Sequence, residues 1–97
     1  MNEQPWSVYL VECVDGSLYC GIAVNVDARV RRHNAGRGAK YTRSRLPVRL
    51  RWQTVIISGK GEAMRVEYRV KRLSRPQKEL LIRGKKLFPL IFLPTQG

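Results

Sequence analysis

The chain has few of the residues that several common kinds of site require. Its 97 residues include two cysteines, Cys13 and Cys20, and one histidine, His33. Two cysteines are too few for a disulfide scaffold or a four-cysteine zinc site, and a mixed His/Cys site would also need carboxylates. One histidine without a Gly-x-Ser-x-Gly turn gives no support for serine-hydrolase chemistry. We therefore expect two reduced thiols and a cytoplasmic location.

Long apolar runs are also missing. No stretch approaches the roughly 18 apolar residues of a membrane span, and the N-terminus lacks the charged and apolar regions of a secretory signal. We expect no association with membranes. The hydrophobic fraction of 43% is typical of a folded domain. We expect one domain over residues 1–97, with a core at about 7–83 and an apolar C-terminal tail at 84–97.

Acidic residues are scarce, and their placement is uneven. Seven acids face nineteen basic residues, for a net charge of +12. Residues 1–28 contain no Lys or Arg, whereas residues 28–61 contain ten basic residues and no acid. A solvated surface is the plain explanation of a charge run, but ten like charges in one folded segment repel each other. The pattern therefore favours a polyanionic partner, and the excess of Arg over Lys suits contacts with the phosphates of a nucleic acid. A membrane surface is less favoured, because this stretch lacks an apolar stripe with Trp and Phe.

Two strands joined by Asp15-Gly16 begin the predicted fold, at residues 7–14 and 17–22. A two-residue loop would place Tyr9 and Tyr19 on opposite faces of the sheet. A three-residue loop with Gly16 at the left-handed position pairs Tyr9 with Gly21, and both tyrosines then share a face.

The rest of the chain alternates between helical and extended patterns. Asn25 is positioned to cap a helix over 26–35, a basic loop follows at 36–47, and alternation predicts a strand over 48–57. Two helices complete the chain, over 61–73 and from Pro76 to 82. We expect an α/β domain in two layers, with a three-stranded antiparallel sheet flanked by helices in the order β-β-α-β-α-α.

One acid in the basic half, Glu67, flanks the apolar stripe of its helix. Composition alone favours a surface ion pair with Lys71, four residues later, which stabilises a helix by roughly 0.3–0.5 kcal/mol.

The ordered set of motifs changes that interpretation. Ser7-Val8-Tyr9, Tyr19-Cys20-Gly21, the spacing of Arg29 and His33, the loop Gly36-Arg37-Gly38-Ala39-Lys40-Tyr41-Thr42 and the helix carrying Glu67 together resemble the GIY-YIG nuclease superfamily. The loop is similar to that of its small stand-alone bacterial members. The resemblance extends over about residues 7–82. The first two motifs depart from the family name, because they read Ser-Val-Tyr and Tyr-Cys-Gly, but they keep both tyrosines and the glycine.

The resemblance implies a metal-dependent endonuclease. Glu67 would hold one Mg²⁺ or Mn²⁺ ion, which needs only one or two carboxylates besides water and phosphate. Arg29 would contact the scissile phosphate, and Tyr9 and Tyr19 would line the site, one of them as general base. His33 would orient a tyrosine or a water. Because both tyrosines must then reach one site, we adopt the three-residue hairpin loop.

The same resemblance implies a nucleic-acid interface. Its expected residues are Gly21, which would leave space for a phosphate, Arg37, Lys40, Tyr41 as a platform for a base, Thr42, Arg43, Arg45 and Lys71. The expected substrate is DNA, with branched or single-stranded forms suggested by the loop, and RNA is not excluded. Two alternatives stay open: a nucleic-acid-binding module that does not cut, and a catalytic subunit whose protein partner docks on the apolar residues 87–94.

Overall fold

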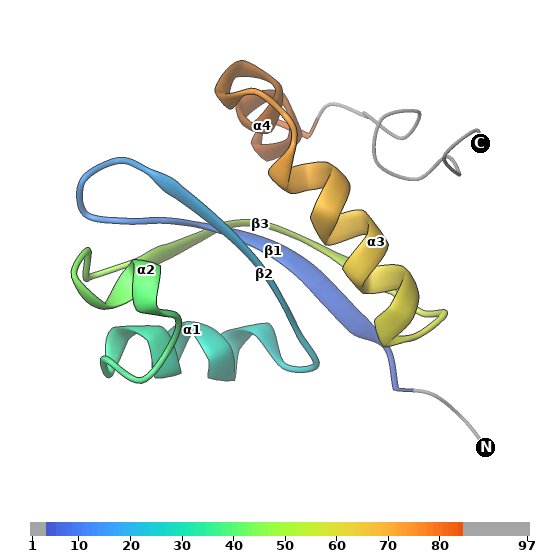
Figure 1. The fold of residues 1–97 in the computed structure, drawn as a ribbon, viewed down its shortest axis with the longest axis horizontal. Coiled ribbons are helices and arrows are strands. Elements are labelled where there is room, and N and C mark those ends of the chain that lie inside the picture. Colours follow the sequence, from blue (N-terminus) through green and yellow to red (C-terminus); the bar gives the residue numbers. More distant parts are fainter. Residues whose placement is uncertain (1–3, 85–97) are drawn as a thin grey trace.

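A computed structural model describes residues 4–84, which form a small sheet with helices against both of its faces (Figure 1). The elements in chain order are β1 (Trp6–Glu12), β2 (Leu18–Ala23), α1 (Val26–Asn34), α2 (Lys40–Arg43), β3 (Arg49–Ile56), α3 (Lys60–Lys71) and α4 (Arg75–Ile82). The strands lie in the order β2-β1-β3 and both pairings are antiparallel. The predicted order β-β-α-β-α-α and the three-stranded antiparallel sheet are confirmed, with α2 as an addition.

The β1–β2 hairpin has the register that places both motif tyrosines on one face. Tyr9 pairs with Gly21, and Val11 pairs with Tyr19. The Cys13 N–H donates to the Ser17 carbonyl at 2.8 Å, and Gly16 closes the three-residue loop with a φ of 86°. Such a φ is strained for residues with a Cβ, so Gly16 selects this loop over the two-residue alternative.

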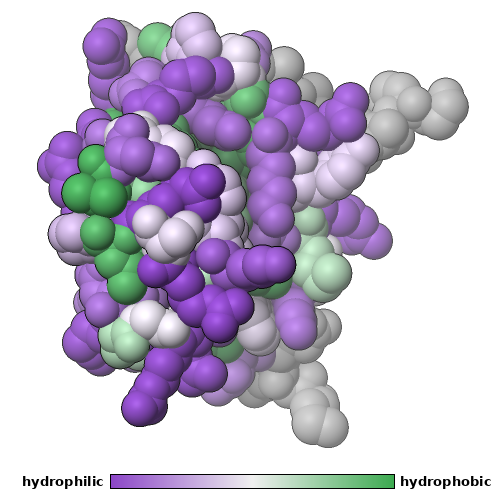
Figure 2. All heavy atoms as spheres, turned by 60° about the vertical axis from the view of Figure 1, so that its left-hand side comes forward, coloured by the Kyte–Doolittle hydropathy of each residue, from purple (hydrophilic) through white to green (hydrophobic). Residues whose placement is uncertain are grey.

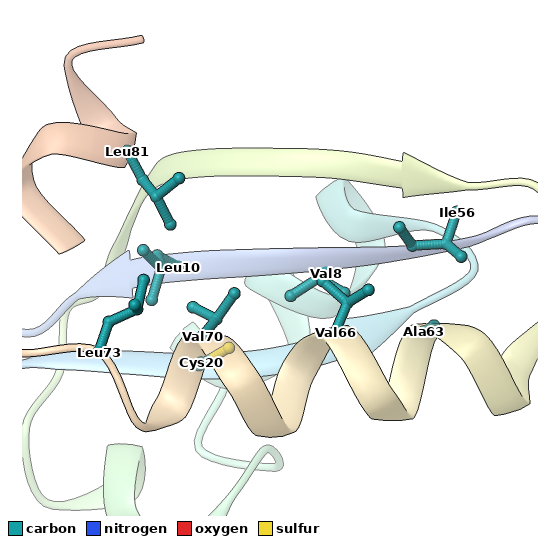
Figure 3. Close-up of a cluster of buried hydrophobic side chains, with 9 residues drawn as sticks. All are labelled: Val8, Leu10, Cys20, Ile56, Ala63, Val66, Val70, Leu73 and Leu81. Atoms are coloured by element: carbon teal, nitrogen blue, oxygen red, sulfur yellow. The ribbon is translucent and has the colours of Figure 1, made fainter. Parts of the chain in front are cut away.

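One face of the sheet packs against α3 and α4. Alternate residues of the strands, Val8 and Leu10 on β1, Cys20 on β2 and Ile56 on β3, point toward apolar side chains of α3 (Figure 3). The α3 residues of this cluster recur at helical spacing, as Ala63, Val66 and Val70 do, and all three are fully buried. Leu73 and Leu81 close the end of this core beside α4.

The opposite face packs against α1 and holds the second set of alternate strand residues. Tyr9 and Val11 from β1, and Cys13 just after it, lie against Val26 of α1 and Val48 before β3. Because helices cover both faces, the sheet is the middle layer of three, one more layer than the sequence indicated (Figure 1).

The basic segment 36–47, expected as a loop, contains the short helix α2. The Ala39 carbonyl accepts hydrogen bonds from the Thr42 and Arg43 N–H groups, at 3.1 and 3.2 Å, and from the Thr42 hydroxyl, at 2.9 Å. Helix α2 has only four residues, too few to show an apolar period in the sequence. Burial of its Thr42 holds this turn in place. No helix within residues 4–84 is long and apolar enough to cross a bilayer. The predicted apolar tail, including residues 87–94, lies outside the described residues apart from Gly84.

Candidate functional site

Helix α1 carries two of the expected site residues on its sheet-facing side. Asn25 caps the helix, since its side-chain oxygen accepts the Ala28 N–H at 2.9 Å. This cap fixes where the helix begins, and therefore which residues face the sheet. Arg29 and His33 are one turn apart, and His33 is buried with 1% of its surface exposed.

A chain of buried hydrogen bonds connects β1, α1 and α2. The Tyr9 hydroxyl oxygen lies 2.8 Å from His33 Nε2, and His33 Nδ1 lies 2.9 Å from the Thr42 hydroxyl oxygen. The Thr42 hydroxyl donates to the Ala39 carbonyl at 2.9 Å. All three side chains are at most 1% exposed. The expectation that His33 orients a tyrosine agrees with this geometry.

Two glycines make room for this chain. A Cβ at Gly21 would lie 2.5 Å from the Tyr9 hydroxyl oxygen, and a Cβ at Gly38 would lie 2.1 Å from His33 Nδ1. Any other residue at either position would push Tyr9 or His33 aside. The space above Gly21 is therefore filled by Tyr9, which corrects the expectation that it holds a phosphate.

The aromatic residues continue outward from His33 to the surface. The Tyr19 and His33 rings meet edge to face with centroids 5.6 Å apart, and Tyr19 stacks on Tyr41 at 6.0 Å. The Arg45 guanidinium covers the Tyr41 ring at 4.0 Å and pairs with Asp15 at 3.1 Å. Tyr41 contacts Tyr19 and Arg45 but is still 39% exposed, so its role as a platform for a base stays a prediction.

Arg29 is the positive charge of the buried cluster. Burial raises the pKa of Tyr9 to about 12, and the nearby Tyr19 adds to this, whereas the charge and hydrogen bond of Arg29 act to lower it. Burial, and then the charge of Arg29, hold the pKa of His33 below its ordinary value. At neutral pH, therefore, Tyr9 keeps its proton and His33 is uncharged. Arg29 favours any step that places negative charge on the Tyr9 oxygen.

Glu67 lies on α3, across the sheet from Tyr9. Its side chain is 20% exposed, and its carboxylate pairs with Lys71 at 3.3 Å, the contact that composition alone indicated. Within the described residues, no hydrogen bond or ion pair connects Glu67 with Tyr9, Arg29 or His33.

The edge strand β2 separates the two groups. The pKa of the Cys20 thiol is raised to about 12 by burial and then by the charge of Glu67, so this carboxylate lies close to β2. Gly21, the next residue, faces Tyr9. Successive strand residues face opposite sides, so Glu67 and Tyr9 approach the free edge of β2 from its two faces.

The remaining expected interface residues divide into exposed and engaged groups. Arg37, Lys40 and Arg43 are exposed. Hydrophilic side chains cover most of the side of the molecule that carries the β1–β2 loop and α2 (Figure 2). Lys71 is engaged by Glu67. Thr42 is fully buried, so the expectation that it contacts nucleic acid directly is wrong.

Two residues of the site were not expected. Gly38 gives His33 its space. Asn34 connects the end of α1 to the chain before β3, accepting the Val48 N–H at 2.8 Å and donating to the Val48 carbonyl at 3.0 Å. Gly38 is the second glycine of Gly36-Arg37-Gly38, and this repeated glycine is a sequence signal for a position that needs space. Nothing in the sequence indicates the partner of Asn34.

The motif residues from Tyr9 to Glu67 all lie within the segment that matches one known catalytic domain. The GIY-YIG catalytic domain matches residues 5–80. The chain belongs to the GIY-YIG family. The hairpin register places its two motif tyrosines on one face of the sheet and pairs Tyr9 with the motif glycine, Gly21.

Similar proteins of this GIY-YIG type occur in distant organisms. A UPF0213 protein of Vibrio cholerae is 48% identical over 80 residues, covering 82% of this chain and 79% of that one. A UPF0213 protein of Halobacterium salinarum is 58% identical over 74 residues, covering 76% and 95%. The solution NMR structure of a UPF0213 protein from Bacillus halodurans has a TM-score of 0.53 and 49% identity, covering 84% of this chain and 85% of that one.

Proposed function

We propose that this GIY-YIG protein is an endonuclease that hydrolyses phosphodiester bonds in DNA with one bound Mg²⁺ or Mn²⁺ ion. The observation that carries the proposal is the buried Tyr9–His33–Thr42 chain beside Arg29. Nucleic-acid binding alone has no use for a buried phenol hydrogen-bonded to a neutral imidazole. Proton transfer during hydrolysis uses such a pair, because the imidazole accepts the proton of the phenol. The net charge of +12 supports a polyanionic substrate, and the two buried free cysteines suit a reducing, cytoplasmic location.

The residues present fit a single magnesium-type ion. Residues 4–84 hold no group of three or more His, Cys, Asp or Glu side chains that would form an all-protein metal cage. Mg²⁺ binds through one or two carboxylates and fills its other positions with water and substrate phosphate. Glu67, part-exposed beside the free edge of β2, is the carboxylate that would hold it. When bound, the ion supplies a positive counter-charge for the phosphate.

The chain's own residues supply the proton transfer and a second counter-charge. As a water attacks the phosphorus, its proton passes to the Tyr9 oxygen and the Tyr9 proton passes to His33 Nε2. The P–O bond to one sugar oxygen breaks, and that leaving oxygen takes its proton from solvent. This shared transfer avoids a free tyrosinate, which a pKa of about 12 makes rare at neutral pH. Arg29 balances the negative charge that develops on the phosphate. After it accepts the proton, His33 is a positively charged imidazolium beside the positive charge of Arg29. The negative substrate phosphate offsets the repulsion between these two charges.

The test is cleavage of labelled single-stranded, duplex, flap and four-way DNA, with RNA alongside, in Mg²⁺ or Mn²⁺. Branched and single-stranded DNA are the forms we expect to be cut best. Glu67→Ala should cut at least 100-fold more slowly while binding is retained, and EDTA should stop the wild type. Glu79→Ala is the matched control, because Glu79 is a part-buried acid that also pairs with a basic residue four positions away, Arg75.

Each other result has a definite meaning. Equal cutting by wild type and Glu67→Ala would contradict a role for Glu67 and point to a contaminant or another site. Tight binding by the wild type without cutting of any substrate would reject the endonuclease proposal in favour of a binding module or a subunit that needs a partner.

A further inference from the structure

A groove of about 560 Å³ runs along α1, outside the buried cluster of Tyr9 and His33. Four arginines line it: Arg29, Arg31, Arg32 and Arg37. The groove is also lined by the small residues Ala23, Ala28 and Ala35, which leave room between the guanidinium groups. Arg29 belongs both to this groove and to the cluster around Tyr9, which makes the two continuous.

The four arginines of this groove form no ion pair with an acid of the described residues. The six ion pairs among the described residues use Glu12, Asp15, Glu62, Glu67 and Glu79, on the hairpin, α3 and α4. None of these pairs includes a groove arginine. Asp27, the acid on α1, is exposed in the first turn and does not line the groove. Four like charges held together without a counter-charge repel each other, so the groove favours an anionic ligand.

Part of the groove is held in position before any ligand arrives. Arg32 Nε donates to the Arg37 carbonyl at 3.1 Å, which connects the helix to the segment that follows it. This bond uses one donor of the guanidinium and leaves its terminal nitrogens available. Helix α1 has nine residues and is therefore about 13 Å long. The groove arginines are spread along this length and into the segment that follows it.

We propose that this arginine groove binds the sugar-phosphate backbone of the nucleic-acid strand that enters the Tyr9 site. Arg31, Arg32 and Arg37 contact phosphates on one side of the bond to be cut, and Arg29 contacts the phosphate at the site itself. The proposal rests on the proposed function for the meaning of that site. The binding it describes, however, can be measured without any cleavage.

The experiment measures binding of a labelled single-stranded DNA by fluorescence anisotropy in EDTA over a range of salt concentrations. The test variant is the triple Arg31→Gln, Arg32→Gln, Arg37→Gln. Its matched control is Arg49→Gln, Arg65→Gln, Arg75→Gln, which removes the same charge from arginines that form ion pairs.

Log affinity falls as log salt rises, and losing three single-strand phosphate contacts should make this slope less steep by about two. We expect the groove variant to show this change, with at least a tenfold loss of affinity near 0.1 M salt, and the control to keep a slope close to that of wild type. Equal losses in both triple variants would mean that total charge, rather than the groove, determines binding, and would overturn the proposal.

A second variant blocks the groove without changing charge. Ala28→Gln places a longer neutral side chain, which helices tolerate well, between the arginines. We expect weaker binding at an unchanged thermal midpoint, and binding equal to wild type would count against the groove. The two proposals also fail separately. Loss of binding in the groove variants with no cutting by wild type would reject only the nuclease. Normal binding by the groove variants, together with cutting by wild type, would reject only the groove.

Discussion

The hydrogen bonds at both ring nitrogens of His33 define its tautomer. The single Thr42 hydroxyl proton goes to the Ala39 carbonyl, so the Thr42 oxygen accepts from His33 Nδ1. Nε2 then carries the lone pair and accepts the Tyr9 proton. The Ala39 N–H also approaches Nδ1, which would suit the other tautomer, but its 3.4 Å separation is long beside the 2.9 Å bonds. We assign the proton to Nδ1, as the proposed proton transfer requires.

NMR of the one histidine in the chain tests this assignment without any assay of cleavage. Long-range ¹H–¹⁵N correlation spectra of the wild type at pH 7.5 should show Nδ1 protonated. The titration midpoint should lie below 6.5, because burial and Arg29 lower the pKa of His33. Thr42→Val should change the tautomer, whereas Thr42→Ser should keep it. A wild-type spectrum with Nε2 protonated would contradict the proton path from Tyr9 to His33.

Gly21 gives a second prediction at this scale. A Cβ there would lie 2.5 Å from the Tyr9 hydroxyl, so Gly21→Ala should cost about 1–3 kcal/mol of unfolding free energy and displace the Tyr9 ring. Gly61→Ala is the control, because Gly61 lies in helix α3 with nothing within 4 Å of an added Cβ. Urea unfolding should show Gly61→Ala at or above wild-type stability. Equal stability of both variants would mean that Tyr9 has room to move.

These residues also show what the sequence could predict of the site. Tyr9, Tyr19 and Gly21 followed from one hairpin register, and the neighbouring positions of Arg29 and His33 followed from helical spacing. Thr42 did not, because its burial depends on where α2 packs after the chain has left α1. A short helix without an apolar period gives no local signal, so the sequence alone predicts that a threonine in a basic loop lies at the surface.

At the scale of elements, Asn34 fixes the end of α1 against the entry to β3. Its side chain pairs with both backbone polar groups of Val48. Asn34→Ala should therefore lower the unfolding free energy by about 1–2 kcal/mol, since both groups lose a partner. Arg31→Ala, on the exposed side of the same helix, should stay within about 0.5 kcal/mol of wild type. Thermal or urea unfolding measures both, and equal changes would contradict a specific role for Asn34.

The helices and strands themselves were largely predictable, since their apolar periods are strong. Which face of the sheet each helix covers was less predictable. The apolar face of α1 is short, with Val26 and His33 as its buried residues, and does not by itself indicate which side of the sheet it covers. The hairpin register decides this, because it directs Tyr9 and Val11 to one face and Val8 and Leu10 to the other.

The whole molecule should lose stability in alkaline solution. Burial raises the pKa of Tyr9 from 10.0 and the pKa of Cys20 from 9.0, each to about 12. The unfolded chain therefore loses these protons at lower pH than the folded one. Stability is complete below pH 9 and falls as the pH rises toward 12. At about 1.4 kcal/mol per pKa unit, Tyr9 contributes about 3 kcal/mol to the fall.

Urea unfolding at pH 8, 10 and 11 measures this loss. Cys20→Ala should reduce the dependence on pH, because one of the two groups is gone. An unfolding free energy that stays constant between pH 9 and 11 would contradict the claim that Tyr9 and Cys20 are buried with their protons in the folded protein.

The central claim is that the Tyr9 hydroxyl, held by His33 beside Arg29, takes part in cutting a phosphodiester bond. Its most direct test is single-turnover cleavage by Tyr9→Phe of the DNA that the wild type cuts fastest, with Kd measured in parallel. Tyr68→Phe is the control, because Tyr68 is 61% exposed on α3. We predict that Tyr9→Phe cuts at least 100-fold more slowly with an unchanged Kd, while Tyr68→Phe matches wild type. Cleavage by Tyr9→Phe at the wild-type rate would contradict the claim.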